Sequence, residues 1–347
     1  MKQHRAGRRG LSGFAISTVV ASYGLIIFGS QVRVTDSGMG CPDWPLCDGR
    51  LAPVLRFHAL MEQSHRYIAA AVTLLVLGTA ALAWRSRAER PASLRPALAA
   101  VGLIGVQVLL GAVTVLAGNA APTVAAHLLT GLALLGCSTV TAVAAGVRRE
   151  PSGPGRLAGI GWVAVAAASA LVVSGSLIVN AEAEGACPAF PLCPSAAPTH
   201  LAVLHLVHRG TAVLAGLALL GFAVHAWRRW AGLAGARVLA GLLVGLVGLT
   251  ATFGAVSALL QAPPGWQDLH LAGAAAVLAV TVGLAARGWL AAADATDAPG
   301  RPRGGQAVPA RTEASSEASS GTSSEASSGS SSDSALTTRL RPPSLDR

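Results

Sequence analysis

The chain has 347 residues, of which 52% are hydrophobic and only 12% are charged, and its net charge is +10. A soluble globular domain carries about a quarter charged residues, so this composition excludes an ordinary soluble protein and indicates a membrane protein. The positive charge does not indicate nucleic-acid binding, because the basic residues gather in short segments between apolar runs.

Hydrophobic runs long enough to cross a bilayer recur along the chain. About 20 apolar residues span a hydrocarbon core of about 30 Å, and the sequence contains eight such runs. Their approximate ranges are 13–33, 63–84, 97–118, 122–147, 157–180, 201–227, 238–260 and 267–290. The alternating pattern of a membrane β-barrel is absent, and the Gly and Ala residues within the runs suit close helix packing in lipid. The sequence therefore predicts an all-α membrane protein with eight transmembrane helices.

Basic residues divide unequally between the two sides of these helices. Among residues 1–290, fifteen of the twenty Lys and Arg residues lie on one side and five on the other. Because cytoplasmic loops are enriched in Lys and Arg, the first side is expected to be cytoplasmic, with both termini inside. We expect a multi-pass protein of the plasma membrane, and the first run is longer than the apolar region of a cleaved signal peptide.

The ends of the chain differ in composition from its middle. Residues 1–12 form a short basic segment that we expect to be a cytoplasmic arm. Residues 291–347 are rich in Ser, Gly, Ala and Glu and contain too little apolar surface to repay the cost of ordering. This second segment is therefore predicted to be a disordered cytoplasmic tail.

The second half of the membrane region repeats the first. The outer loop Cys41–Cys47 matches Cys187–Cys193 at an offset of 146, and the pair His65-Arg66 matches its second-half counterpart at an offset of 143. A repeated supersecondary unit is the usual origin of such spacing. We therefore predict two tandem four-helix bundles, residues 13–150 and 151–290, related by a pseudo-twofold axis along the membrane normal.

Four histidines lie at matching positions, with 62 residues separating the members of each pair. The pairs are His65 with His127 and His208 with His270. Ionisable residues inside membrane segments are costly to bury and are candidates for function, although any one of them could simply hydrogen-bond to a neighbour. Two histidines across a four-helix bundle are typical of a haem site, whereas zinc usually takes three or four ligands. The pattern predicts two bis-histidine haem sites.

The halves differ one helical turn before the first histidine of each pair. Glu62 precedes His65 by three residues, and His205 takes the equivalent place before His208. Residues three apart share a helix face, and a carboxylate beside an iron ligand can transfer protons or stabilise a cation. We take Glu62 as the candidate catalytic residue. The alternative is a solvated acid, or one paired with Arg66.

Two cysteines lie in each outer loop, on the side of the membrane where disulfides persist. A disulfide is therefore predicted between Cys41 and Cys47 and another between Cys187 and Cys193. Each disulfide could be purely structural or redox-active. A zinc site is disfavoured because the spacing is not C-x-x-C.

These residues resemble the haem A synthases, in the bacterial branch with paired cysteines. The resemblance covers residues 13–290. It rests on the loop 34–49, the Glu62-x-x-His65-Arg66 signature, the stretch from Thr114 through Pro122 to His127, and the second-half His208-Arg209 and His270. One departure is Asp36, where the family pattern has glycine.

The resemblance implies oxidation of a haem O methyl group to a formyl group, which gives haem A for terminal oxidases. Two hydroxylations produce a gem-diol, which loses water. His65 and His127 would bind the iron of the substrate haem, with Glu62 beside the reacting edge. His208 and His270 would bind a retained haem b that passes electrons.

The same resemblance implies redox work for Cys41–Cys47 and a structural role for Cys187–Cys193. Haem O synthase and the assembly factors of terminal oxidases are the implied partners, and a homo-oligomer is compatible with the sequence. The electron carrier is not specified.

Two other functions fit two haem sites in a membrane protein. One is a dihaem b-type cytochrome that passes electrons from quinol to an outer partner, and the other is a haem carrier without chemistry. The difference between Glu62 and His205 favours an enzyme, because electron transfer alone needs no such asymmetry.

Overall fold

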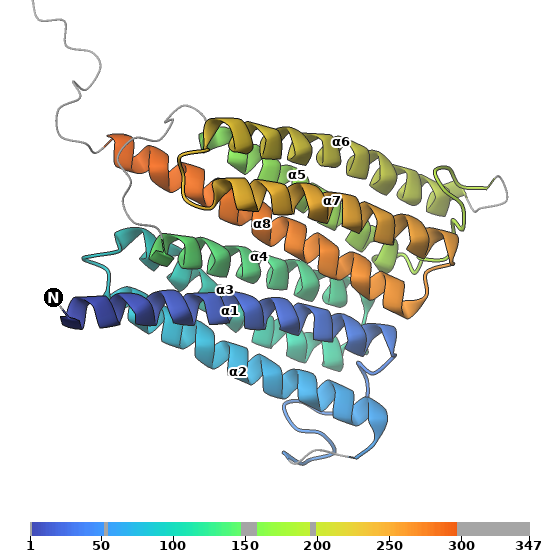
Figure 1. Cartoon of the computed structure of the whole chain (residues 1–347). Helices are drawn as coiled ribbons and strands as arrows, with labels where there is room; N and C mark the ends of the chain where they lie inside the picture. Colours follow the sequence, from blue (N-terminus) through green and yellow to red (C-terminus); the bar gives the residue numbers. More distant parts are fainter. Residues whose placement is uncertain (1, 52–54, 147–157, 195–198, 297–347) are drawn as a thin grey trace, which may run out of the picture. The chain divides into compact units, whose positions relative to one another are not determined.

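The computed structural model describes residues 2–51, 55–146, 158–194 and 199–296. Eight α-helices make up this part of the chain (Figure 1), and each contains a segment long and apolar enough to cross a membrane. They are α1 (Lys2–Val34), α2 (Phe57–Arg85), α3 (Pro91–Leu116), α4 (Ala121–Gly146), α5 (Ala158–Asn180), α6 (Thr199–Arg229), α7 (Ala236–Leu259) and α8 (Pro264–Thr296). The prediction of an all-α protein with eight candidate spans is confirmed.

Several helices begin earlier than the apolar runs suggested. Helix α1 includes the basic segment predicted to be a separate arm, and α2 begins at Phe57. Polar residues continue these helices because the backbone hydrogen bonds of a helix do not depend on apolar side chains. As a result His65 and His208 lie in the third turn of their helices. The predicted disordered tail lies largely outside the described residues.

Each helix packs against specific neighbours. In the first half α1 contacts α2 and α4, and α3 also contacts both of these. In the second half α5 contacts α6 and α8, and α7 also contacts both. Helix α8 additionally packs on α1 and α4, and α4 packs on α5. Figure 1 shows α1–α4 and α5–α8 as two neighbouring groups of long helices.

Small residues allow the helices to approach closely. Within the largest buried cluster, Ala164 and Ala168 of α5 pack with Ala275 and Ala285 of α8. A Cβ atom added to Gly161 would lie 2.8 Å from the Cβ of Ala285. Membrane helices gain little from the hydrophobic effect and rely on this close packing, so the contact between α5 and α8 depends on the absence of larger side chains.

The connections that carry the cysteines lie at one end of the helices. The α1–α2 and α5–α6 loops are at the right-hand end in Figure 1. The second residue of each loop is in the left-handed region, Asp36 (φ 52°) in the first and Glu182 (φ 51°) in the second. Glycine reaches this region without strain, and Asp is one of the residues that tolerate it. The departure at Asp36 therefore preserves the turn that a glycine would make.

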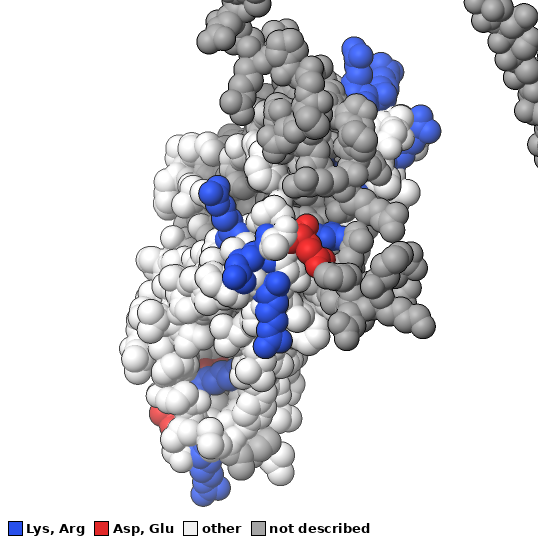
Figure 2. Space-filling view, turned by 90° about the vertical axis from the view of Figure 1, so that its left-hand side faces the viewer, with Lys and Arg blue, Asp and Glu red and all other residues white. Residues whose placement is uncertain are grey.

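Basic residues gather at the opposite end of the helices. The α2–α3 connection and the end of α2 contain Arg85, Arg87 and Arg90, and the α6–α7 connection lies between Arg229 and Arg237. Figure 2 views the molecule from this end, and blue side chains predominate there over red. The two ends of the described helices thus differ in charge, as the sequence predicted.

Candidate functional site

The four predicted histidines lie at the end of the helices that carries the cysteine loops. Each belongs to the N-terminal part of an even-numbered helix: His65 in α2, His127 in α4, His208 in α6 and His270 in α8. All four are partly buried. The structure thus places them at a common end of the bundle.

A glycine of the preceding helix lies against each histidine ring. A Cβ atom added to any of these glycines would lie 2.7–3.5 Å from the Cε1 atom of the ring. The contacts are Gly29 with His65, Gly111 with His127, Gly175 with His208 and Gly254 with His270. The glycines occupy matching positions in the two halves of the sequence, but only the structure shows that they make room for the imidazoles.

The second-half histidines face each other at close range. The ring centroids of His208 and His270 are 6.3 Å apart, and the rings are nearly perpendicular, at 86°. A metal–imidazole bond of about 2 Å puts the centroids of two rings roughly 6 Å apart when a single ion lies between them. The spacing of this pair therefore fits one metal ion held from two sides.

Hydrogen bonds orient both second-half rings. The Nδ1 atom of His208 lies 2.9 Å from the hydroxyl of Ser174, and that of His270 lies 3.0 Å from the backbone oxygen of Thr250. A carbonyl oxygen can only accept, so His270 donates from Nδ1 and keeps its lone pair on Nε2. A histidine that ligates a metal typically donates its other nitrogen in this way.

The first-half histidines lack these hydrogen bonds. These histidines are His65 and His127. The Nδ1 atoms of both are buried and have no hydrogen-bond partner among the described residues. Phe28 stacks against His65, with centroids 6.3 Å apart and an angle of 15° between the rings. Buried polar atoms without partners are rare and often mark functional positions.

Glu62 is buried and connects α2 to the first cysteine loop. Its side chain accepts a hydrogen bond from the backbone N–H of Cys41 at 2.8 Å and one from Arg66 at 2.5 Å. Arg66 also donates to the backbone oxygen atoms of Asp43 and Leu46 in the loop. The pairing with Arg66 that we considered from the sequence is present, and it holds a carboxylate at only 4% exposure.

The second loop is held in a related way with different chemistry. His205, which occupies the position equivalent to Glu62, donates from Nε2 to the backbone oxygen of Ala183 at 2.8 Å. Arg209 donates to the backbone oxygen atoms of Pro191 at 2.7 Å and Cys187 at 3.3 Å. Both arginines therefore bind a cysteine loop, but only the first half places a buried acid there.

Both predicted disulfides are present, Cys41–Cys47 and Cys187–Cys193. The first loop is closed further by Asp43, whose carboxylate accepts hydrogen bonds from the backbone N–H groups of Gly49 at 2.9 Å and Asp48 at 2.7 Å. These bonds, that of Gly49 most strongly, lower the pKa of Asp43. The loop above Glu62 is thus fixed by a covalent bond and by backbone hydrogen bonds.

Polar contacts join the two halves near the histidines. Ser30 and Gln31, which follow the glycine beside His65, both donate to the buried carboxylate of Asp268. Arg33 forms an ion pair with Glu184 at 3.1 Å and donates to Gln267 at 2.7 Å. The end of α1 is therefore attached to the start of α8, two residues before His270.

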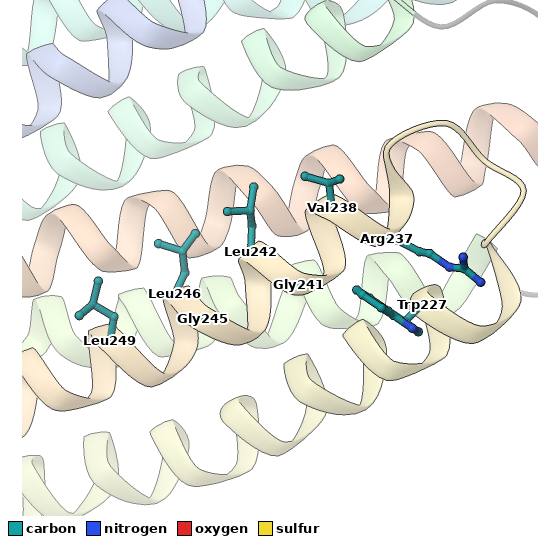
Figure 3. A pocket seen from close by; sticks show the side chains of 8 residues that line it. All are labelled: Trp227, Arg237, Val238, Gly241, Leu242, Gly245, Leu246 and Leu249. Carbon is teal, nitrogen blue, oxygen red and sulfur yellow. The ribbon is translucent and has the colours of Figure 1, made fainter.

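A groove of about 660 Å³ lies away from these residues, between α6 and α7 (Figure 3). It is lined by Trp227, Arg237, Val238, Gly241, Leu242, Gly245, Leu246 and Leu249. None of the four histidines lines it. No group of three or more His, Cys, Asp or Glu side chains in the described part of the chain is arranged to hold a metal ion.

Comparison with known proteins agrees with this arrangement. The sequence profile of the COX15-CtaA family, described as cytochrome oxidase assembly protein, matches residues 12–282. The chain is 28% identical over 235 residues to heme A synthase of Bacillus licheniformis, covering 64% of this chain and 77% of that protein. It is 31% identical over 188 residues to heme A synthase of Alkalihalophilus pseudofirmus, covering 51% of this chain and 63% of that protein.

A shorter similarity connects the chain to another class of protein. Protoheme IX farnesyltransferase of Halobacterium salinarum is 34% identical over 122 residues, which cover 35% of this chain and only 27% of that protein. The profile match, in contrast, includes all four histidines, Glu62 and both cysteine pairs. With eight candidate membrane spans and this match over most of its length, the chain belongs to the COX15-CtaA family of haem A synthases.

Proposed function

We propose that the chain oxidises a methyl group of haem O to a formyl group and so produces haem A for terminal oxidases. The observation that carries the proposal is the asymmetry between two otherwise similar histidine pairs. Both pairs lie at one end of the bundle, but the buried residue one helical turn before the first histidine is a carboxylate, Glu62, in the first pair and an imidazole, His205, in the second. Family membership supplies the class of reaction.

The first pair has the properties expected of a substrate haem site. The Nδ1 atoms of His65 and His127 are buried without hydrogen-bond partners in the described part of the chain, and Gly29 and Gly111 leave space beside their rings. Imidazole is a common axial ligand of haem iron. His65 and His127 would thus bind the iron of haem O.

The second pair has the properties expected of a retained haem b. The ring spacing of His208 and His270 fits one iron between them, and both rings are oriented by hydrogen bonds. Bound there, haem b would supply one-electron redox chemistry. The residues of the chain would hold and orient it.

Glu62 is the group that would serve the reaction beside the substrate. It lies one turn from His65 on the same helix, and the contacts with Arg66 and with Cys41 fix its position. A positioned carboxylate can accept the proton released as the methyl group is oxidised, or stabilise positive charge on it. The carboxylate is buried where it contacts the first cysteine loop.

The repeated contacts support a pseudo-twofold relation between two four-helix halves, 13–150 and 151–290. Arg66 and Arg209 bind equivalent loops, and four glycines contact four histidines at matching positions. The basic end would face the cytoplasm, which places both termini inside and the cysteine loops outside. Haem O synthase, oxidase assembly factors and an electron carrier are the proposed partners. A redox role for the Cys41–Cys47 disulfide is a separate proposal.

Conversion of haem O is the direct test of this function. The chain is expressed in membranes supplied with haem O, and the extracted pigments are separated and identified by mass. We expect formyl-bearing haem A to appear and haem O to fall. Accumulation of haem O without haem A, in protein that carries two haems, would instead support the dihaem electron-transfer cytochrome.

The glycine contacts predict a further result. In Gly254→Val the added side chain begins 2.7 Å from His270, so the ring must move and the second haem should be lost or bind with altered ligation. Gly248→Val is the matched control, since a Cβ atom there would meet no described atom within 4 Å apart from the nearby backbone of its own helix. Haem content and the optical spectrum of the purified variants measure the difference. Equal haem content in both would contradict the role given to Gly254.

A further inference from the structure

The two histidine pairs differ in the residues that contact the ring nitrogen turned away from the proposed iron. In the second half Ser174 contacts His208, and Thr250 accepts from His270. The sequence repeat places Phe28 at the position of Ser174 and Gln107 at that of Thr250. The difference therefore lies in residues next to the ligands rather than in the ligands.

Ser174 is oriented to accept a hydrogen bond from His208. Its hydroxyl donates to the backbone oxygen of Leu171 at 2.8 Å, so an oxygen lone pair is left for the Nδ1 atom at 2.9 Å. His208 is thereby held with its proton on Nδ1 and its lone pair on Nε2. His270 is held in the same form by Thr250. Both imidazoles are ready to ligate before any haem arrives.

The described residues of the first half offer no equivalent hydrogen bond to either ring. Phe28 stacks on His65 and has no hydrogen-bonding group. Gln107 donates to the backbone oxygen of His127 at 2.8 Å rather than to the ring, and its own side-chain oxygen is buried without a partner in the described structure. Among the described residues, no hydrogen bond to Nδ1 orients the imidazole of His65 or His127, so neither ring is fixed in its ligating form.

We propose that the residue pair Ser174 and Phe28 determines which site retains its haem and which releases it. Ser174 makes the second site a permanent one, and Phe28 keeps the first site exchangeable, as binding of a substrate and release of a product require. This inference rests on the proposed function, because it assumes two haem sites. Partners that orient a metal-binding histidine typically change metal affinity by about 10–100-fold.

Three variants on α5 test the first part of the proposal. Ser174→Ala removes the acceptor, Ser174→Thr keeps a hydroxyl, and Ser176→Ala is the matched control, since Ser176 donates to the backbone oxygen of Val173 instead of a histidine. The purified proteins are mixed with excess apomyoglobin, and transfer of haem b is followed by absorbance. We expect transfer from Ser174→Ala to be about ten times faster or more, and transfer from the other two to match the parent.

The midpoint potential of haem b gives an independent measurement. Loss of a hydrogen bond from Nδ1 weakens electron donation by the ring, so the potential should rise in Ser174→Ala and stay unchanged in Ser176→Ala. If Ser174 had only a structural role, Ser174→Ala would lower the stability of the protein without raising the midpoint potential of haem b. Equal transfer rates and equal potentials in the two alanine variants would overturn the role of Ser174.

The reciprocal change tests the first site. Phe28→Ser introduces a hydroxyl beside His65, and Phe28→Ala removes the ring without adding one. After loading with haem O, Phe28→Ser should release haem to apomyoglobin more slowly than Phe28→Ala. Equal release by the two variants would overturn the role of Phe28.

Failure of this inference is distinct from failure of the proposed function. If the parent protein binds two haems and all the variants behave alike, only the inference is wrong. If the parent protein binds no second haem when supplied with haem O, the proposed function itself is wrong.

Discussion

Replacing Glu62 with glutamine is expected to reduce formation of haem A by about 10²–10⁴-fold, the usual contribution of a positioned acid or base. Glutamine keeps the volume of the side chain and an oxygen that can accept from the N–H of Cys41. It removes the negative charge and the ability to accept a proton. Product analysis of membranes supplied with haem O measures the effect, and the haem content of the variant should be unchanged.

Glu184→Gln is the control for this experiment. Glu184 also forms an ion pair with an arginine, Arg33, at 3.1 Å, but it follows α5 in the second loop and contacts no histidine that we assign to haem. We expect its activity to stay near that of the parent. Turnover by Glu62→Gln at the rate of this control would remove Glu62 from the mechanism and leave it the structural role of holding the first loop.

Replacing His208 with alanine is expected to remove haem b. One of the two histidines that would bind the iron is then missing, and a cavity replaces a ring that Gly175 and Ser174 contact in the parent. The purified variant should lose the low-spin b-type spectrum and most of its haem A production, since electrons would no longer pass through this site. Optical spectra and extracted haem per protein measure the result.

His225→Ala is the matched control on the same helix. His225 lies near the opposite end of α6, where its ring centroid is 6.0 Å from that of Trp230. The His225→Ala variant should retain the spectrum of the parent. A low-spin b-type spectrum that persists in His208→Ala at full intensity would show that the ligand assignment is wrong.

The sequence repeat predicted much of the site, because equivalent histidines and cysteine loops in the two halves need similar neighbouring residues. The offsets of 143 and 146 identified four histidines, two disulfides and the exchange of Glu62 for His205. The structure confirms the disulfides and places the histidines at one end. Their ligation of haem stays a prediction, as do the roles of Glu62 and the Cys41–Cys47 pair.

Helix boundaries were less accurate, because apolar runs mark the part of a helix that lies in lipid and not the part that continues into the polar region. Helix α2 begins at Phe57 although the apolar run starts near residue 63. The tolerance of Asp36 for a positive φ could have been anticipated from residue type. The contacts of Arg66 and Arg209 with their loops could not have been anticipated. Every residue has a backbone carbonyl oxygen, so the sequence does not show which of them accept a hydrogen bond.

By itself, the sequence determined the membrane class, the eight helices, the repeat and the identity of the candidate ligands, since each depends on composition or spacing along the chain. Only the tertiary structure decided which neighbours the histidines have. Ser174 contacts His208 across two helices, while Phe28 stacks on His65 at the matching place in the other half. Such contacts depend on how helices pack, and one side chain with or without a hydroxyl then determines whether an imidazole is held for a metal.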